Sequence, residues 1–310
     1  MRNSFKRMLS MNYIVKKLIR FYMRDFIALT ELDNPEFAIG LADLKKKLPQ
    51  NSAPPKRVKA KMDIIKRKVT GGIYYIARDR NNRSNKKVLF IHGGGFFLEA
   101  MPLHWRLCQR LARDTGCEII FPEYPMVPES DAKECHIMLM EVYRELMKHS
   151  RSEDVTIIGD SAGGTLSLSL SMLARDRGLP LANEIILISP GFIIGEMNEK
   201  ERKRAEYIKK NDAILGLFPI SKISELWLGD LDVSEYRADA TKGSIRGLPH
   251  ITMFSGTHDM MNIPARRFAK KMKKEGHPFS YFEKKGGAHD YALLKKSHEE
   301  YNIMISKIIR

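Results

Sequence analysis

Short apolar runs and longer amphipathic segments alternate along most of the chain. After residue 55 the apolar runs predict eight strands, at Met62–Val69, Ile73–Ala77, Val88–Ile91, Glu118–Phe121, Val155–Ile158, Ile185–Ser189, Ile251–Phe254 and Phe279–Glu283. From the third run onward, segments with helical periodicity predict intervening helices, at Leu103–Asp114, Ala132–His149, Ala162–Arg177, Ile263–Glu275 and Ser297–Ile309. The central runs are continuously apolar, as in strands covered on both faces. The alternation therefore predicts an α/β fold with a mostly parallel eight-stranded sheet flanked by helices.

Two segments depart from this alternation. Only Thr70–Gly72 separates the first two predicted strands, which predicts a hairpin with antiparallel strands. Residues Phe192–Glu235 are rich in charge and have a helical pattern, so we expect them to be an insertion between two strands of the sheet. In an open α/β sheet, an insertion after the carboxyl end of a strand lies over the ligand crevice.

The first 55 residues differ from the rest of the chain. Apolar residues between Met8 and Leu29 fall on one helical stripe, and seven basic residues precede the first acidic residue, Asp25. The polar, proline-rich stretch Leu48–Pro55 then predicts a linker or a long loop. We expect residues 1–55 to be a helical segment with its linker and residues 56–310 to be the main domain.

The net charge is the unusual feature of the composition. The 310 residues include 53 Lys and Arg against 37 Asp and Glu, a formal net charge of +16, and residues 1–70 hold 17 of these basic residues but only 6 of the acidic ones. The basic helix could pack on the main domain with its charges in solvent, lie on an anionic membrane surface, or contact phosphates. Of these three alternatives, packing of the basic helix on the main domain is favoured. Nucleic acid is least favoured, because no recognisable nucleic-acid-binding motif accompanies the charge.

Cysteine content and hydropathy indicate the compartment. The three Cys residues form no C-x-x-C pair, which argues against a disulfide framework and a structural zinc site and suits a reducing compartment. No uncharged apolar stretch approaches the roughly 20 residues of a membrane-spanning helix, and basic residues interrupt every candidate signal peptide. We expect a cytoplasmic protein, with peripheral contact between the basic helix and anionic membranes as the alternative. The oligomeric state stays open, with a homodimer as one option.

A candidate nucleophile lies in Gly159-Asp160-Ser161-Ala162-Gly163, which matches G-x-S-x-G. The motif follows a predicted strand and opens a predicted helix, which is the context that a nucleophile elbow requires. Side chains at the flanking glycines would collide with the neighbouring strand and helix. The alternative is a glycine-rich turn with an incidental serine; the functional interpretation is favoured.

A second glycine motif directly follows the strand predicted at Val88–Ile91. In His92-Gly93-Gly94-Gly95-Phe96, the consecutive glycines would let backbone N–H groups approach a substrate carbonyl, as an oxyanion hole needs. A tight turn alone would also use glycine. The two motifs together favour acyl-transfer chemistry.

The nucleophile needs a base and an orienting acid. His289 follows the last predicted strand, and Asp259 follows the strand before it, so both are expected at the sheet edge that carries Ser161. The order Ser, Asp, His is that of this hydrolase architecture. His258 is a weaker candidate for the base, because its immediate neighbour Asp259 could hardly orient it. Asp160 is expected to support the elbow.

These motifs resemble the hormone-sensitive-lipase family of α/β-hydrolases, whose members are esterases. The resemblance covers roughly residues 86–310 and rests on HGGGF at 92–96, GDSAGG at 159–164, GTHDM at 256–260 and GGAHDY at 286–291. It implies that Ser161 is the nucleophile, Asp259 the acid and His289 the base. It also implies an oxyanion hole made by the backbone N–H groups of Gly94, Gly95 and Ala162, and no metal or organic cofactor.

The resemblance also implies a cap and shows two departures. In this family an N-terminal helical segment and an insertion after the sixth strand form a helical cap, which residues 1–50 and 192–235 would supply. Pro125 stands where the family usually has Arg, and Asp290 stands where Gly is common. Neither of these two departures removes a catalytic group, but both affect what the resemblance implies about the substrate pocket.

The function expected from the sequence is that of a serine carboxylic-ester hydrolase acting on small-molecule esters with short to medium acyl chains. Phe96, Phe97 and Phe192 are the candidate substrate-binding residues. Amidases and formamidases use the same triad and remain an alternative. A binding protein on a hydrolase scaffold is less favoured, because all three triad residues are present.

Overall fold

A computed structural model describes residue 29 and residues 34–47, 52–212, 215 and 220–310. Eight strands form one sheet in the order β1-β2-β4-β3-β5-β6-β7-β8. Their bounds are β1 Met62–Val69, β2 Gly72–Asp79, β3 Lys87–Ile91, β4 Glu118–Glu123, β5 Val155–Asp160, β6 Glu184–Ile188, β7 His250–His258 and β8 Phe279–Ala288. The predicted eight-stranded sheet is confirmed.

Strand directions follow the sequence pattern. The β1–β2 and β2–β4 pairs are antiparallel, and the pairs from β4 to β8 are parallel. The predicted hairpin is therefore confirmed. β7 and β8 continue four and five residues beyond the predicted ends, where polar and glycine residues replace the apolar run. These extensions carry the chain to the sheet edge where Asp259 and His289 follow.

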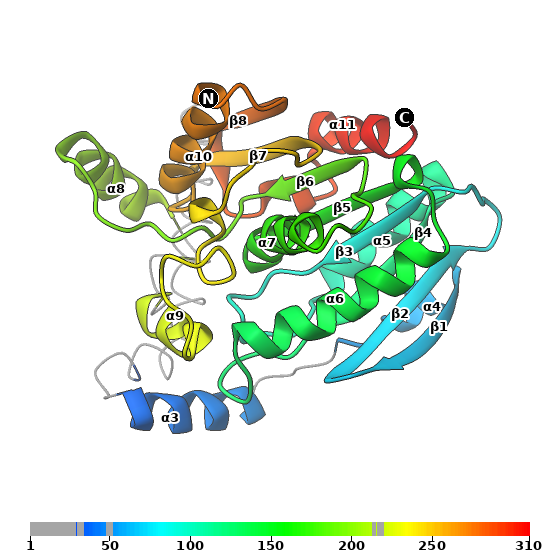
Figure 1. The fold of residues 1–310 in the computed structure, drawn as a ribbon, viewed down its shortest axis with the longest axis horizontal. Helices are drawn as coiled ribbons and strands as arrows, with labels where there is room; N and C mark the ends of the chain where they lie inside the picture. Colours follow the sequence, from blue (N-terminus) through cyan, green and yellow to red (C-terminus); the bar gives the residue numbers. More distant parts are fainter. Residues whose placement is uncertain (1–28, 30–33, 48–51, 213–214, 216–219) are drawn as a thin grey trace, which may run out of the picture.

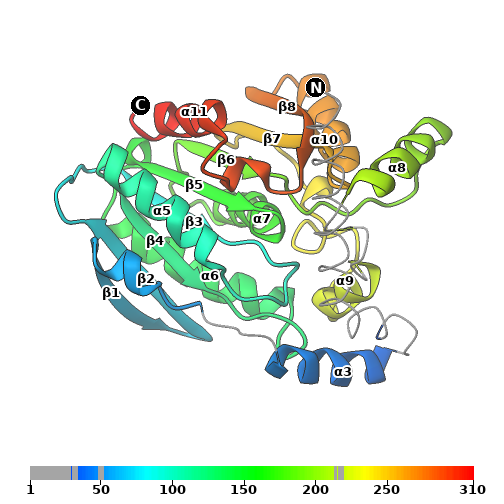
Figure 2. The ribbon, with the colours of Figure 1, turned by 180° about the vertical axis from the view of Figure 1, so that it is seen from behind.

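Helices cover both faces of the sheet (Figures 1 and 2). Their bounds are α5 Pro102–Thr115, α6 Ala132–Lys148, α7 Ala162–Asp176, α10 Asn262–Lys274 and α11 His298–Ile308. α5 and α11 lie on one face, and α6, α7 and α10 lie on the other. Within β6, Ile186 and Ile188 pack with the first group, whereas Ile185 and Leu187 pack with the second. The alternating side chains of a strand therefore enter two cores, which explains the continuously apolar central runs.

Local signals set where the helices begin and end. The Asp131 carboxylate accepts hydrogen bonds from the backbone N–H groups of Lys133 and Glu134 and so caps α6. α5 ends at Gly116, whose φ of 72° places it in the left-handed region that favours glycine. The start of α6 and the end of α5 thus set where the loops between these helices and the strands begin and end.

Three further helices lie beyond the carboxyl edge of the sheet. They are α3 Asn34–Lys47, α8 Glu199–Asn211 and α9 Ile220–Leu228, and a short helix, α4 Lys56–Lys59, precedes β1. α3 and α9 lie side by side in both views, and the Lys222 ammonium lies 5.7 Å from the centre of the Phe37 ring. An N-terminal segment thus packs against the insertion. The predicted amphipathic helix between Met8 and Leu29 lies outside the described residues, except for Leu29 itself.

Candidate active site

Three loops meet at the carboxyl edge of the parallel strands. Ser161 follows β5, Asp259 follows β7 and His289 follows β8. Because parallel strands end at the same edge, residues far apart in the sequence converge there. All three side chains are buried, with at most 8% of each residue exposed. The structure thus brings together the three residues that the sequence places in a triad.

Ser161 stands in a strained turn between β5 and α7. Its backbone has φ 48° and ψ −120°, a conformation that L-residues with side chains rarely adopt. The turn is held by hydrogen bonds from Ser161 N–H to the Ile188 carbonyl, 2.9 Å, and from Gly191 N–H to the Ser161 carbonyl, 2.7 Å. A Cβ at Gly163 would meet the carbonyl oxygens of Ile91 and His92. Glycine there lets α7 begin in contact with β3.

A chain of hydrogen bonds links the three polar side chains. When His289 is neutral, the Ser161 hydroxyl donates to His289 Nε2 at 2.9 Å, and His289 Nδ1–H donates to Asp259 Oδ1 at 3.0 Å. Asp259 Oδ1 also accepts from the Met261 backbone N–H at 2.8 Å, which fixes the carboxylate. This tautomer leaves Nε2 free to take the serine proton.

Carboxylates surround the imidazole. Burial disfavours the charged form of His289, but Asp259 and Asp290 outweigh it and raise the pKa of His289 to about 10. Asp290 Oδ2 lies 3.3 Å from the same Nε2 that contacts Ser161. Asp212, at the end of α8, adds a weaker upward influence, and its carboxylate accepts from the Met260 N–H at 3.0 Å. Asp212 could not be singled out from the sequence, because nothing in the charged insertion distinguishes one acidic residue from another.

The HGGG loop lies against the nucleophile turn. A Cβ at Gly93 would meet the Asp160 carboxylate and would lie 2.9 Å from Ser161 Cβ, so glycine allows this close approach. The hydrogen bonds within the described part of the chain do not use the backbone N–H groups of Gly94, Gly95 or Ala162 as donors. These groups are thus available to an oxyanion.

Buried polar side chains support both turns from behind. The His104 Nε2–H group donates to Asp160 Oδ2 at 3.1 Å, and His104 Nδ1 accepts from the Met101 backbone N–H. Tyr124 donates to the His92 carbonyl at 2.7 Å and stacks on the His92 ring at 4.6 Å. Burial and nearby His104 lower the pKa of His92 to about 4, so this ring is neutral. Asp160 thus pairs with His104 and lies apart from the Ser161–His289–Asp259 chain.

His258 lies outside this hydrogen-bond chain. Its Nε2 is 3.2 Å from the Tyr207 hydroxyl of α8, while the neighbouring Asp259 carboxylate contacts His289. The sequence's preference for His289 over His258 therefore matches the geometry.

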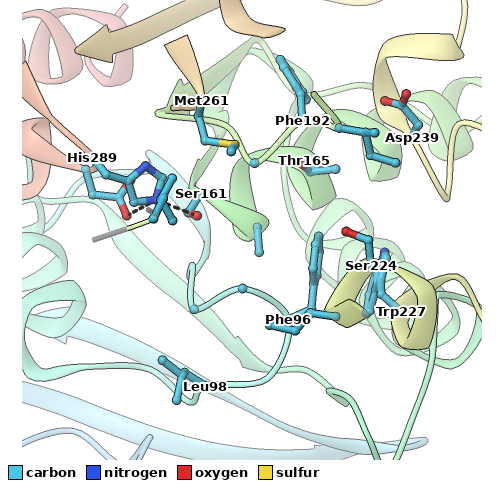
Figure 3. Close-up of a pocket in the computed structure, with 18 of the residues that line it drawn as sticks. Phe96, Leu98, Ser161, Thr165, Phe192, Ser224, Trp227, Asp239, Met261 and His289 are labelled. Carbon is cyan, nitrogen blue, oxygen red and sulfur yellow. Dashed lines mark hydrogen bonds and ion pairs between the residues drawn. The ribbon is translucent and has the colours of Figure 1, made fainter. Parts of the chain in front are cut away.

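A cavity of about 330 Å³ opens on Ser161 and His289 (Figure 3). Its walls are mainly apolar and include Phe96, Phe192, Trp227 and Met261. The Phe96 and Trp227 rings stack at 4.2 Å, so an HGGG-loop residue meets helix α9 at the wall. Trp227 and Met261 could not be singled out from the sequence, because their position depends on how the insertion and the loop after β7 fold over the site.

Phe97 does not line this cavity. Its side chain is 1% exposed and packs in the core, whereas its neighbour Phe96 does line the cavity. Phe96 has φ 64°, in the left-handed region that side-chain-bearing residues rarely adopt, and of the two adjacent residues only Phe96 belongs to the cavity wall. The expectation that Phe97 contacts substrate is thus corrected, whereas Phe96 and Phe192 both line the cavity.

Neither a cluster of metal-ion ligands nor a membrane-spanning helix occurs among the described residues. No group of three or more His, Cys, Asp or Glu side chains there is arranged to hold a metal ion. No helix among the same residues has the length and apolar character needed to span a bilayer.

Residues 88–293 match a family described as having the alpha/beta hydrolase fold. The chain belongs to this family. The match spans β3 to the loop beyond β8 and includes the HGGG loop, the nucleophile turn, Asp259 and His289. It confirms the α/β-hydrolase fold expected from the motifs.

Several curated members of this hydrolase group are similar in sequence. A triacylglycerol lipase of Mycobacterium tuberculosis is 28% identical over 67% of this chain, an esterase of Acinetobacter venetianus 27% over 60%, and an acetyl-hydrolase of Streptomyces hygroscopicus 25% over 65%. The aligned parts cover 42%, 61% and 66% of these relatives. The hydrolase chain thus spans less than two thirds of each relative's length.

Solved structures share the fold. A Staphylococcus aureus protein superposes with a TM-score of 0.79 at 24% identity, covering 91% of this chain and 95% of its own. An esterase of the bacterial hormone-sensitive lipase family superposes with a TM-score of 0.72 at 19% identity. The superposition covers 93% of this chain and 98% of the esterase. The chain thus shares its overall fold with these solved structures.

Proposed function

We propose that this α/β-hydrolase is a serine carboxylic-ester hydrolase that acts on small esters with short to medium acyl chains. The observation that carries the proposal is the chain of hydrogen bonds from Ser161 through His289 to Asp259, which ends at an apolar cavity. The relatives named lipase, esterase and acetyl-hydrolase support an ester substrate.

In the proposed mechanism, His289 Nε2 takes the Ser161 proton as Oγ attacks the ester carbonyl. Asp259 holds the imidazole in the tautomer that carries its proton on Nδ1 and stabilises the imidazolium. His289 then returns the proton to the leaving alkoxide oxygen, and the alcohol departs. Water attacks the acyl-enzyme by the same route, which releases the acid and restores the Ser161 hydroxyl.

The oxyanion of each tetrahedral intermediate would be stabilised by the backbone N–H groups of Gly94, Gly95 and Ala162. Their lack of other acceptors among the described residues supports this role. Ala162 also begins α7, whose N-terminal dipole favours negative charge. One such donor is worth on the order of 3 kcal/mol in the transition state.

The cavity supports a preference for short to medium acyl chains. Its volume of about 330 Å³ lies at the lower end of the range for small-molecule sites. Phe96 and Phe192 lie in its walls and would contact the substrate. The same site could hydrolyse amides or formamides, and a panel of esters, arylamides and formamides would rank the three classes.

We further propose that α3, α8 and α9 act as a two-part cap over the site, with residues 1–55 supplying one part and 192–235 the other. The contact of α3 with α9 and the position of Trp227 in the cavity wall support this division. The basic N-terminal segment is proposed to touch anionic membranes, a role that rests on its sequence.

The test of the function is a p-nitrophenyl ester series from acetate to decanoate, run with wild type and with Ser161→Ala. We expect wild-type kcat/KM to be highest for the shorter chains and Ser161→Ala to lose at least about a thousandfold in kcat, because the nucleophile is gone. Thermal unfolding should show that the variant stays folded. Turnover by Ser161→Ala at the wild-type rate would refute the assignment.

A further inference from the structure

Asp290 is a polar group beside the reacting atoms that the proposed mechanism does not use. Its Oδ2 lies 3.3 Å from His289 Nε2, and its Oδ1 is buried without a hydrogen-bond partner in the described structure. The backbone there is left-handed, with φ 56°, and the Asp290 N–H donates to Ser189 Oγ at 3.1 Å. The side chain is therefore held in place at the catalytic nitrogen.

The position of the leaving group follows from this contact. The imidazolium must deliver its proton through Nε2 to the leaving oxygen, so that oxygen lies within hydrogen-bond distance of Nε2. Asp290 Oδ2 contacts the same nitrogen and belongs to a residue that lines the cavity. In the proposed mechanism, the alcohol part of an ester would therefore lie next to the Asp290 carboxyl.

The charged residues around the cavity are acidic, which also bears on the alcohol part of the substrate. Although the chain carries a net charge of +16, the residues that the structure places around the cavity include Asp239 and Asp290 but no Lys or Arg. Within the described parts of the chain, the cationic partner that Asp290 finds is His289. The remaining walls are largely apolar, with the stacked rings of Phe96 and Trp227 among them.

We propose that Asp290 selects esters whose leaving alcohol carries a quaternary ammonium group. This inference rests on the proposed esterase function and specifies its substrate class. A quaternary cation needs no hydrogen-bond partner, so an apolar and aromatic cavity with a carboxylate beside His289 suits it better than a strongly hydrated primary ammonium. The carboxylate would attract the cation as the ester docks and would hold the alcohol beside His289.

The state of Asp290 makes the preference dependent on pH. Burial raises the pKa of its carboxyl well above the ordinary value; His289 opposes this rise, while Asp160 and Asp259 add to it. A raised pKa means that the carboxyl ionises later as pH increases. The preference for a cationic alcohol should therefore grow with pH, because loss of the proton that Asp290 shares with His289 leaves the pair with a net negative charge that attracts the cation.

The experiment compares choline butyrate with 3,3-dimethylbutyl butyrate, which has the same shape but a neutral carbon in place of the nitrogen. We expect wild-type kcat/KM to be about tenfold higher for the choline ester, and Asp290→Asn to lose most of that ratio. Because the ratio is taken within each variant, a change in the basicity of His289 affects both substrates and cancels.

Asp239→Asn is the matched control, because it removes the other carboxylate of the cavity wall. The preference should survive this change. Equal kcat/KM for the two esters in wild type, or a ratio that Asp290→Asn leaves intact, would overturn the inference. A ratio lost only in Asp239→Asn would also overturn it.

A second measurement needs no variant. Choline should inhibit p-nitrophenyl acetate hydrolysis by wild type at a concentration about tenfold lower than 3,3-dimethylbutanol does, and this gap should widen as pH rises. Equal inhibition would contradict the role of Asp290. The outcomes also separate the two proposals: wild type inactive on all esters refutes the esterase, whereas activity without a charge preference refutes only the role of Asp290.

Discussion

His289 shares its proton with more than one carboxylate. Asp259 contacts Nδ1, and Asp290 contacts the Nε2 that must accept the serine proton. Because these carboxylates outweigh burial, the imidazolium persists to higher pH than in an isolated histidine. His289 and Asp290 are thus best regarded as a pair that holds one proton tightly.

This pair predicts an alkaline pH–rate profile. His289 must be neutral to act as a base, so kcat/KM should rise with pH as the imidazolium loses its proton, with the midpoint above the ordinary histidine value of about 6.5. Asp290→Asn should move that midpoint down by about one unit, because it removes the carboxyl that shares the proton with Nε2 and favours the imidazolium. Glu196→Gln, an exposed residue in the insertion, serves as the charge control. An unmoved midpoint in Asp290→Asn would contradict the pairing.

At the residue scale, the sequence predicts where a side chain lies when the element just before it determines that position. Ser161, Asp259 and His289 were predictable because each follows an apolar strand directly, and the end of a strand fixes where the next residue lies. Phe96 and Phe97 were not distinguishable, because a positive φ at Phe96 decides which ring enters the cavity. No residue type signals that conformation at a phenylalanine.

At the scale of elements, Arg267 joins the insertion to the sheet domain. From α10 it donates hydrogen bonds to both carboxylate oxygens of Glu201 on α8, at 2.8 and 2.6 Å, and to the backbone carbonyls of Ile194 and Glu196. The guanidinium holds the pKa of Glu201 down at about 2, mainly through these hydrogen bonds. α8 has only one buried residue, Ile208, so polar contacts carry much of its attachment.

Arg267→Gln should therefore loosen α8 without unfolding the sheet. We expect trypsin to cleave within residues 199–211 about tenfold faster, because hydrogen bonds to a charged group contribute roughly 1.5–3 kcal/mol. Glu199→Gln is the control, since it breaks the exposed pair with Lys203, whose contribution should be small. Mass spectrometry of the first fragments reports the site. Equal cleavage rates in the two variants would show that Arg267 does not anchor the helix.

At the same scale, the sequence predicts the helices and strands but not the contacts between distant ones. Periodicity predicted every strand of the sheet and the five helices that cover it, because each buries a regular apolar pattern. It predicted that residues 192–235 form an insertion, but not that Trp227 stacks on Phe96. That contact joins segments more than 100 positions apart, and only tertiary packing specifies it.

At the scale of the whole molecule, the charge is segregated. Residues 1–70 carry much of the excess positive charge, whereas the cavity wall carries two Asp and, among its described residues, no Lys or Arg. Electrostatic attraction to an anionic surface would then act mainly on the basic residues of the N-terminal segment. The proposed membrane contact and the proposed substrate selection thus rest on charges of opposite sign.

This segregation predicts salt-sensitive binding to anionic vesicles through the first 24 residues. Wild type should co-sediment with phosphatidylserine vesicles at low salt and dissociate at about 0.5 M salt, because screening weakens attraction between exposed charges. Replacing Lys16, Lys17, Arg20 and Arg24 by Gln should reduce binding at least tenfold, since each basic residue near such a surface contributes about 1 kcal/mol. Replacing the exposed Lys270, Lys273, Lys274 and Lys285 removes the same charge elsewhere and should leave most binding intact. Equal losses in the two quadruple variants would mean that overall charge, and not the N-terminal segment, attracts the protein to the vesicles.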